Sequence, residues 1–421
     1  MSPTPWTISL AFLSAVRLAI PLAVLAAAGS TLPGLPHYDR PRGLSGDATG
    51  FYAAAREFMA AWGRVPHVVL ALLAAATLAG AVAGVRVWRR RPELRAWLLV
   101  AAAWWIGGLL VLNVAEERFS GAAVIGWPIV WAVPMLPDRL AGGPLDPNIA
   151  FWLGLPLQLT CNVITVVATA YAGLYATGRR AVGVLAAAAF AFWPLLTGLI
   201  AGHRAWSNGT WPVDAGLHMY TEPLSTALVA VALAFLLSPR LMPLRLALGG
   251  CALGFATAVK ISNAVVAAAG ALFLAWRFRS ELSRIAPYLA GGLAFAPLVL
   301  AYWRLGYAKL TKDPSYWPRD PFGLSYVDTS WTHSLLFTPR TLTIIVPLAV
   351  VGVVAVRRSA LAPLVAWTLA NPLLYSFYSY TPIHPRFLWA SLPPFFVLWS
   401  AGAAWIVALG PRLRLARASA A

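Results

Sequence analysis

Long apolar stretches recur along the whole chain, and short segments between them carry most of the charged and polar residues. A helix of about 20 mostly apolar residues is long enough to cross the hydrocarbon core of a bilayer. Twelve stretches approach that length, and they cover residues 8–30, 66–87, 96–114, 148–176, 181–200, 222–238, 241–258, 262–276, 286–303, 341–356, 361–378 and 387–409. The pattern predicts an all-α, polytopic membrane protein with about twelve transmembrane helices.

The composition agrees with this pattern. Of the 421 residues, 60% are hydrophobic and 11% are charged, which excludes an ordinary soluble domain of this length. We treat residues 1–421 as one integral membrane domain, because no low-complexity linker or repeat divides them. Residues 1–276 form the expected core, with a first outer loop at 31–65, and residues 277–421 add further helices and an outer loop at 304–340. The first apolar run is interpreted as a span, because no basic segment precedes it.

Arginine clusters follow every second apolar stretch and define one face of the membrane. Short loops rich in Lys and Arg usually face the cytoplasm. The clusters are Arg86, Arg89, Arg90, Arg91 and Arg95; Arg179 and Arg180; Arg240 and Arg245; Arg277, Arg279 and Arg284; Arg357 and Arg358; and Arg412, Arg414 and Arg417, and we add Arg17 to the set. Membrane topology thus explains the net charge of +18, and no nucleic-acid partner is expected. Both termini are predicted to be cytoplasmic.

Twelve of the fourteen acidic residues fall in the segments on the opposite side, so we expect the chemistry at the outer face of the cell membrane. The abundance of Ala and Arg is typical of a bacterial protein from a GC-rich genome. Residues 121–137 are also apolar, but one more crossing there would move every later Arg cluster outside. Their three prolines favour a re-entrant or interfacial segment.

Asp47 opens a short helical pattern in the first outer loop. Five apolar residues recur there at helical spacing and form one stripe: Phe51, Ala55, Phe58, Met59 and Trp62. Tyr52 lies beside that stripe and is a candidate substrate contact. The pattern predicts an amphipathic helix in the membrane interface. Asp47 would cap this helix, and it could equally act as a carboxylate at the lipid–water boundary.

Lys260 is one of three lysines, and it lies where two apolar stretches meet. An ionisable residue at membrane depth is a functional hypothesis by default, although a lysine at a hairpin tip can also extend to the interface. Two outer acids, Asp214 and Glu222, are candidate substrate-binding residues. A turn explains Asp214 as well, because Pro212 and Gly216 lie two residues before and after it, and Glu222 suits a helix start before Pro223.

Basic residues also stand at the outer ends of spans, against the usual charge bias. Arg204 and Arg386 are the candidates, and His384 lies two residues before the second of them. A guanidinium can bind a phosphate with two parallel hydrogen bonds. Anchoring of the helix ends explains these residues equally well.

Other chemistries find little support in the sequence. We find no HExxH, paired CxxC, P-loop, GxSxG or GxGxxG motif in a suitable setting. The six histidines have no metal-ligand spacing, and Cys161 and Cys251 lie inside apolar runs, so no disulfide framework is expected. No metal site or cofactor is assigned, and a divalent cation is left open.

The chain resembles the GT-C glycosyltransferases, including those related to the dolichyl-phosphate-mannose mannosyltransferases. An acid on an interfacial helix after the first span is typical of that family. Three stretches strengthen the likeness: Thr221–Leu228 with its acid-Pro start, the Gly-rich Gly250–Asn263, and His384–Pro394 with its basic start. The family usually has a tighter acidic pair in the first loop, whereas Asp47 has no adjacent acid, so metal dependence stays open.

By this resemblance, the protein would transfer a sugar from a polyprenyl-phosphate donor to a hydroxyl of a glycan, lipid or protein acceptor. Asp47 would be the general base of an inverting transfer, and Lys260, Arg386 and Arg204 would bind the donor phosphate. Two further readings remain: a flippase or transporter of a lipid-linked or anionic solute, and a polymerase or ligase of lipid-linked glycans.

Overall fold

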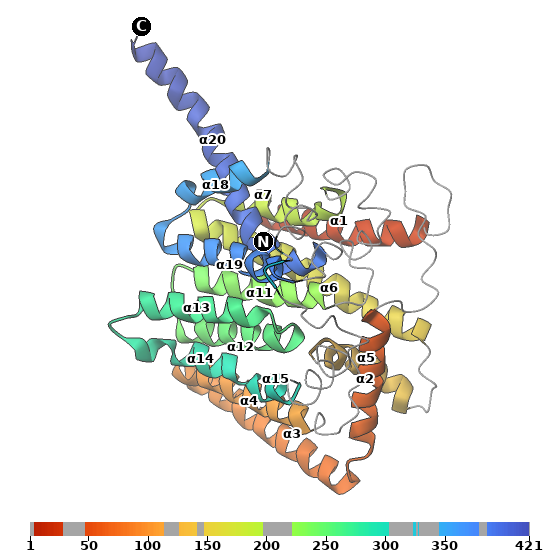
Figure 1. The fold of residues 1–421 in the computed structure, drawn as a ribbon. Helices are drawn as coiled ribbons and strands as arrows, with labels where there is room; N and C mark the ends of the chain where they lie inside the picture. The colour runs from red at the N-terminus through yellow and green to blue at the C-terminus, as the bar shows by residue number, and fades with distance from the viewer. Residues whose placement is uncertain are drawn as a thin grey trace.

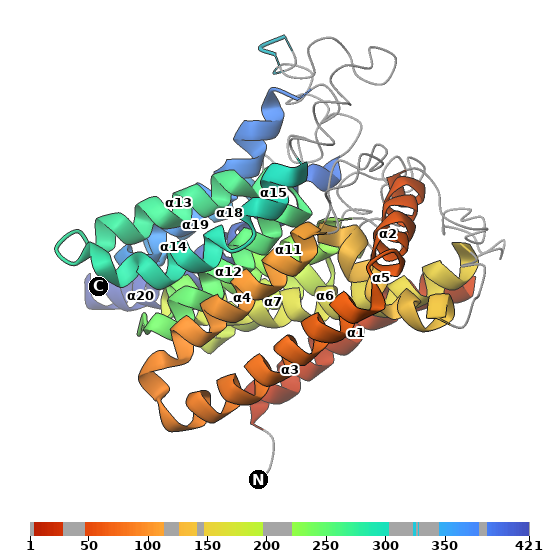
Figure 2. The same cartoon turned by 90° about the horizontal axis from the view of Figure 1, so that it is seen from below.

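A computed structural model describes residues 4–27, 47–112, 126–140, 147–196, 221–302, 323–325, 327, 345–378 and 385–420. The regular structure of these residues is helical, as predicted. The elements are α1 (Pro5–Ala27), α2 (Asp47–Gly63), α3 (His67–Arg90), η1 (Pro92–Leu94), α4 (Arg95–Leu112), α5 (Gly126–Leu140), α6 (Pro147–Thr177), α7 (Arg180–Ala191), α11 (Glu222–Leu237), α12 (Pro243–Val259), α13 (Asn263–Arg277), η2 (Leu282–Ile285), α14 (Ala286–Leu293), α15 (Ala296–Tyr302), α18 (Val346–Ala355), α19 (Arg358–Ser376), η6 (Pro385–Ser391) and α20 (Leu392–Ala420). Most of them lie side by side, whereas α2 runs across the others (Figures 1 and 2).

Every one of the twelve predicted apolar stretches contains a helix. Five helical segments in the described residues are long and apolar enough to cross a membrane: Pro5–Ala23, His67–Arg90, Pro92–Val111, Ile149–Thr177 and Arg386–Leu409. These helices are compatible with a multi-pass membrane protein, and the count of twelve spans stays a prediction. The stretch 286–303 is divided between α14 and α15 rather than forming one helix.

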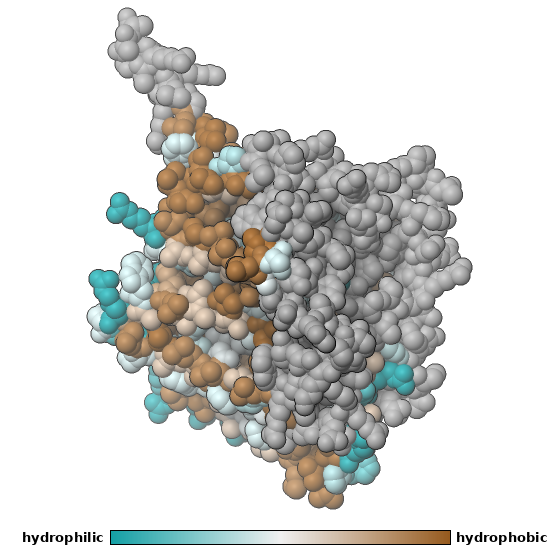
Figure 3. Space-filling view, viewed as in Figure 1, coloured by the Kyte–Doolittle hydropathy of each residue, from teal (hydrophilic) through white to brown (hydrophobic). Residues whose placement is uncertain are grey.

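The described arginine clusters gather at one end of the bundle. The turns after α3, α6, α11, α13 and α18 all lie at the left of Figure 1, and hydrophilic residues line that edge in Figure 3. Two of these turns contact each other, because the Arg357 N–H donates to the Ala176 carbonyl at 2.9 Å. Gly178 lies between them at φ +78°, where any Cβ would meet the Arg357 guanidinium. A glycine adopts this left-handed conformation without the strain that most other residues would have.

Arg17 does not belong to that exposed set. Its side chain lies inside the bundle and has no exposed surface. We therefore correct its assignment to the basic inner face. Large apolar side chains such as Leu272, Leu300 and Val354 are exposed, and hydrophobic residues cover much of the described surface in Figure 3. Such a surface suits a lipid environment.

Glycines bring helix backbones into direct contact. A Cβ at Gly250 would meet the Tyr288 carbonyl, and one at Gly254 would meet Gly292, so α12 and α14 touch along one line. Where lipid surrounds the helices, small residues at a crossing allow the close packing that holds helices together. This packing fixes the position of α12, and therefore that of Lys260, which directly follows its last residue.

A second apolar cluster surrounds α2 and α5. Phe51, Ala55, Phe58 and Met59 are buried as the predicted stripe requires, but Tyr52 is also buried, with 5% of its surface exposed. Its ring lies 6.0 Å from that of Trp131 in α5. The buried face of α2 is therefore wider than one stripe. The fifteen residues of α5 cover most of the apolar segment 121–137, and the re-entrant interpretation of this segment stays a prediction.

Candidate functional site

Three of the eight predicted site residues come together at the end of the bundle opposite the basic turns. They are Glu222, Lys260 and Arg386. Asp47 is the first residue of α2, and its side chain lies outside the described residues. Arg204, Asp214 and His384 also lie outside them. Tyr52 packs in the α2–α5 core.

Glu222 is the first residue of α11 and the centre of the cluster. Pro223 fixes the start of the helix, since its ring suits the first turn and removes an N–H that would lack a partner. The positive end of the helix dipole favours an acid at this position. The side chain is buried, with 4% of its surface exposed, and the Thr221 hydroxyl donates to Oε2 at 3.3 Å.

Lys260 ends α12 in an extended conformation, and its N–H still donates to the Ala256 carbonyl at 2.8 Å. Its Nζ lies 3.2 Å from Oε1 of Glu222. Only 13% of the lysine side chain is exposed. The ammonium is therefore directed to a buried carboxylate rather than extended into solvent at the tip of a hairpin.

Arg386 approaches the same oxygen from η6, with its Nε 3.7 Å from Oε1 of Glu222 and 10% of its side chain exposed. One carboxylate thus faces two cations, and these three described side chains together have a formal charge of +1. Removing charges from water is costly, and a mutual attraction of this kind offsets the cost only when the partners are close. The excess positive charge can attract an anion.

Two aromatic rings form a wall beside the cations. The Lys260 Nζ lies 4.7 Å from the centroid of Phe387 and 5.3 Å from that of Tyr375. These rings stack on each other at 5.0 Å with 14° between their planes. The Arg386 guanidinium lies 5.4 Å from the Phe387 ring. Ring faces attract cations, so the wall holds both side chains at the site.

Asn263 links the turn that contains Lys260 to α11. Its amide Nδ2 donates to the Ser225 hydroxyl at 2.7 Å and to the Ala256 carbonyl at 2.9 Å. Both side chains are almost fully buried. Hydrogen bonds between buried partners are expensive to lose, so they fix Lys260 and Glu222 relative to each other.

α2, which begins at Asp47, packs on α5, and α5 in turn contacts the end of α12 next to Lys260. The backbone of Val259 lies 2.8 Å from where a Cβ of Gly126 would be, so the start of α5 touches the residue before Lys260. Trp127 and Trp131 stack along α5 at 5.8 Å, and the Trp131 N–H donates to the Ala150 carbonyl at 2.8 Å. Because α2 packs on Trp131, one continuous apolar body links α2 to the end of α12.

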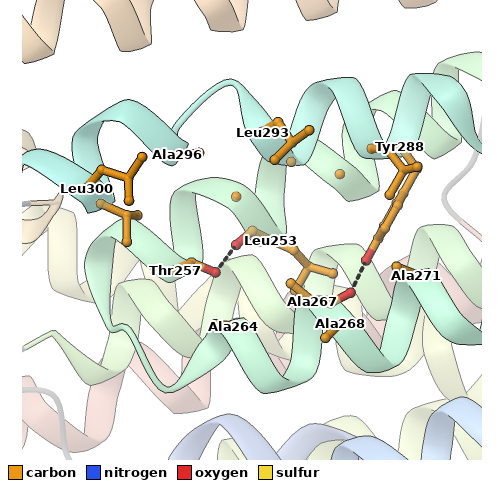
Figure 4. Close-up of a pocket in the computed structure, with 15 residues that line it drawn as sticks. Leu253, Thr257, Ala264, Ala267, Ala268, Ala271, Tyr288, Leu293, Ala296 and Leu300 are labelled. Atoms are coloured by element: carbon orange, nitrogen blue, oxygen red, sulfur yellow. Dashed lines mark hydrogen bonds between the residues drawn. The ribbon is translucent and has the colours of Figure 1, made fainter. Parts of the chain in front are cut away.

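An apolar groove of about 370 Å³ runs between α12 and α13 on one side and α14 and α15 on the other (Figure 4). Its lining is mostly Gly, Ala and Leu. Two of its hydroxyls, those of Thr257 and Tyr288, donate to the Leu253 and Ala267 carbonyls, each at 2.9 Å. The groove is therefore suited to hydrocarbon. Thr257 and Ala264 lie three residues before and four residues after Lys260, so the groove reaches the helix ends that flank Lys260, although Glu222, Lys260 and Arg386 are not among its lining residues.

Several side chains of the site were not identified as candidates from the sequence. They are Tyr375, Phe387, Ser225 and Asn263. Phe387 and Asn263 stand next to predicted residues within the quoted stretches, so their neighbourhood was a usable signal. Ser225 likewise lies in the quoted stretch Thr221–Leu228, whereas Tyr375 has no such signal, because aromatic residues are common in spans.

In the part of the chain that the structure describes, no three His, Cys, Asp or Glu residues are grouped as metal ligands would be. Comparison of the chain with protein-family models, with curated proteins and with solved structures gives no match.

Proposed function

We propose that the chain is a membrane glycosyltransferase of the GT-C kind that takes its sugar from a lipid-linked phosphate donor. One observation carries the proposal. Two largely buried cations, Lys260 and Arg386, lie close to the carboxylate of Glu222, and the turn that carries Lys260 joins two helices that line an apolar groove.

The charge of the cluster suits a phosphodiester. A sugar phosphate ester of a lipid carries one negative charge, and the cluster has a formal charge of +1. Without a donor, Glu222 would reduce the repulsion between Lys260 and Arg386. During transfer the phosphate becomes a leaving group with more negative charge, and cations held in place before the reaction stabilise that charge.

The lipid part of the donor would occupy the apolar groove. Its lining offers hydrocarbon contacts, and its end beside Lys260 would put the phosphate next to the cations. A donor that arrives through the membrane needs no nucleotide-binding domain. This is consistent with a chain built of apolar helices.

Asp47 is the proposed general base. The acceptor oxygen would attack the anomeric carbon, the bond from that carbon to the phosphate oxygen would break, and its electron pair would leave with the phosphate. The acceptor proton would pass to the Asp47 carboxylate. Such help is typically worth about 10²–10⁴-fold in rate. The contact of α5 with Val259 brings the α2 body towards the cluster and supports this role. Tyr52, buried against Trp131, would support α2 rather than contact substrate.

The test is transfer by the purified full chain with a panel of radiolabelled polyprenyl-phosphate sugars. We expect release of polyprenyl phosphate with one of the sugars, and loss of that release in Asp47→Asn with donor binding retained. Arg358→Gln, at the basic end of the bundle, is the control and should keep full turnover. Equal turnover in Asp47→Asn and the parent chain would refute the assignment of the base.

One observation favours a transporter of an anionic lipid as the second candidate. Four polar residues on one face of α6 are fully buried: Gln158, Asn162, Thr165 and Thr169. Polar residues inside a membrane bundle often mark a substrate path. A transporter would move a labelled polyprenyl-phosphate sugar across liposomes without releasing the sugar. Release without such flux would exclude it.

A further inference from the structure

The guanidinium of Arg17 contacts three elements other than its own helix. It lies in α1 and has no exposed surface. Its Nη2 donates to Oδ1 of Asn162 in α6 at 3.1 Å. Its Cζ lies 4.9 Å from the Phe190 ring in α7 and 5.7 Å from the Trp389 ring in η6. A charged side chain inside a membrane bundle is costly, so its presence calls for a function.

The contact with Trp389 connects Arg17 to the anion site. Residues three apart in a 3₁₀ helix eclipse each other, so Arg386 and Trp389 lie one above the other on the same side of η6. One of these residues faces Glu222, and the other contacts Arg17. The two arginines are therefore coupled through one turn of helix.

The helix η6 depends on side-chain anchors for its position. It has seven residues, which is long for a 3₁₀ helix, and the hydrogen bonds of such a helix are poorly aligned. Beyond Arg386, Ser391 Oγ donates to the Trp367 carbonyl at 3.0 Å. The Trp389 ring meets Phe190 edge-on, with centroids 6.3 Å apart, and the Arg17 guanidinium lies against the same ring.

We propose that Arg17 is a positioning residue for Arg386: its contact with Trp389 fixes η6 so that the Arg386 guanidinium meets the phosphate of the lipid-linked donor. The inference rests on the proposed function. Arg17 makes and breaks no bond, and it acts through the helix. A displacement of about 1 Å at a binding group can cost about 10²-fold in rate, so a loosened η6 is enough to weaken the site.

The test measures binding of farnesyl phosphate to the full chain in phosphatidylcholine nanodiscs, with farnesol as the uncharged control ligand. Arg17→Met removes the charge but keeps an unbranched side chain, and Trp389→Leu removes the ring from the other partner. We expect each variant to weaken farnesyl phosphate binding about tenfold, the size of a desolvated cation–π contact, and to leave farnesol binding unchanged. Arg17→Lys, which keeps the charge, should recover part of the loss.

A double-mutant cycle separates positioning from general support of the fold. In an Arg386→Gln background, Arg17→Met should cause no further loss, because the residue that it positions is gone. A full additional loss in that background would overturn the inference, and so would parent-like binding in Arg17→Met. If Arg17→Met does not fold, Trp389→Leu takes its place in the cycle. Parent-like binding in Trp389→Leu, or a full additional loss in the Arg386→Gln background, would then overturn the inference. If Arg386→Gln and Lys260→Gln both bind farnesyl phosphate as the parent does, the proposed function itself fails.

Discussion

Replacement of Lys260 by methionine is the sharpest test of the proposed phosphate-binding cluster of Glu222, Lys260 and Arg386. Methionine is unbranched, so it keeps the packing against Phe387 and Tyr375 while it removes the ammonium. At 3.2 Å from the Glu222 oxygen, that ammonium contributes a gross attraction of roughly 5 kcal/mol at an effective dielectric constant of about 20. Desolvation of the two groups offsets much of this attraction.

The expected loss of folding free energy is about 1–3 kcal/mol, because Arg386 still faces the carboxylate at 3.7 Å. Binding of an anionic ligand should also weaken. The formal charge of the cluster falls from +1 to zero, and we expect farnesyl phosphate to bind about 10- to 100-fold more weakly, or about 1.4–2.8 kcal/mol.

The assay is calorimetric titration of the full chain in phosphatidylcholine nanodiscs with farnesyl phosphate, and with farnesol as the ligand that lacks the phosphate. Arg358→Met is the matched control, since it removes one positive charge from an exposed position at the other end of the bundle. Unchanged farnesyl phosphate affinity in a folded Lys260→Met protein would refute the phosphate-binding role. An equal loss in Arg358→Met would show that only net charge matters.

Three further predictions follow from the packing and from the proposed chemistry. Gly254→Ala should lower the thermal unfolding midpoint, with a loss of about 1–3 kcal/mol of folding free energy from the clash with Gly292. Gly108→Ala is the control, because nothing lies within 4 Å of a Cβ at that position, and equal midpoints for the two variants would contradict the close α12–α14 contact. Asn263→Ala should cost about 2–3 kcal/mol in denaturant unfolding, because it leaves the buried Ser225 and Ala256 groups without this donor, and an unchanged midpoint would show these bonds to be unimportant. Asp47→Asn should reduce transfer of sugar about 10²–10⁴-fold without weakening binding of farnesyl phosphate, and a parallel loss of both would point to a structural role.

The sequence was sufficient for the helices, because each apolar stretch and each arginine-bearing turn is a local signal. The turn at Gly178 and the turn at Arg357 could be located in this way, but their contact with each other could not. The break between α14 and α15 was also hidden, since both helices have the same apolar composition. Apolar composition reports burial from water and says little about where one helix ends.

The candidate site was predicted in part. Lys260 was found because a lysine at membrane depth is rare, and Arg386 because a basic residue at an outer span end is unusual. Their common partner, Glu222, was assigned on its own, because pairing between distant segments leaves no local pattern. Arg17 was misplaced for a related reason: a count of charges cannot distinguish an arginine at an interface from one enclosed by aromatic rings.

The most direct measurement is an electron cryomicroscopy structure of the full chain with a polyprenyl phosphate bound. We expect density for the phosphate within hydrogen-bonding distance of both Lys260 and Arg386, with the isoprenoid chain in the groove lined by α12, α13, α14 and α15. A phosphate bound at the arginine-rich turns, away from Lys260 and Arg386, would contradict the proposal.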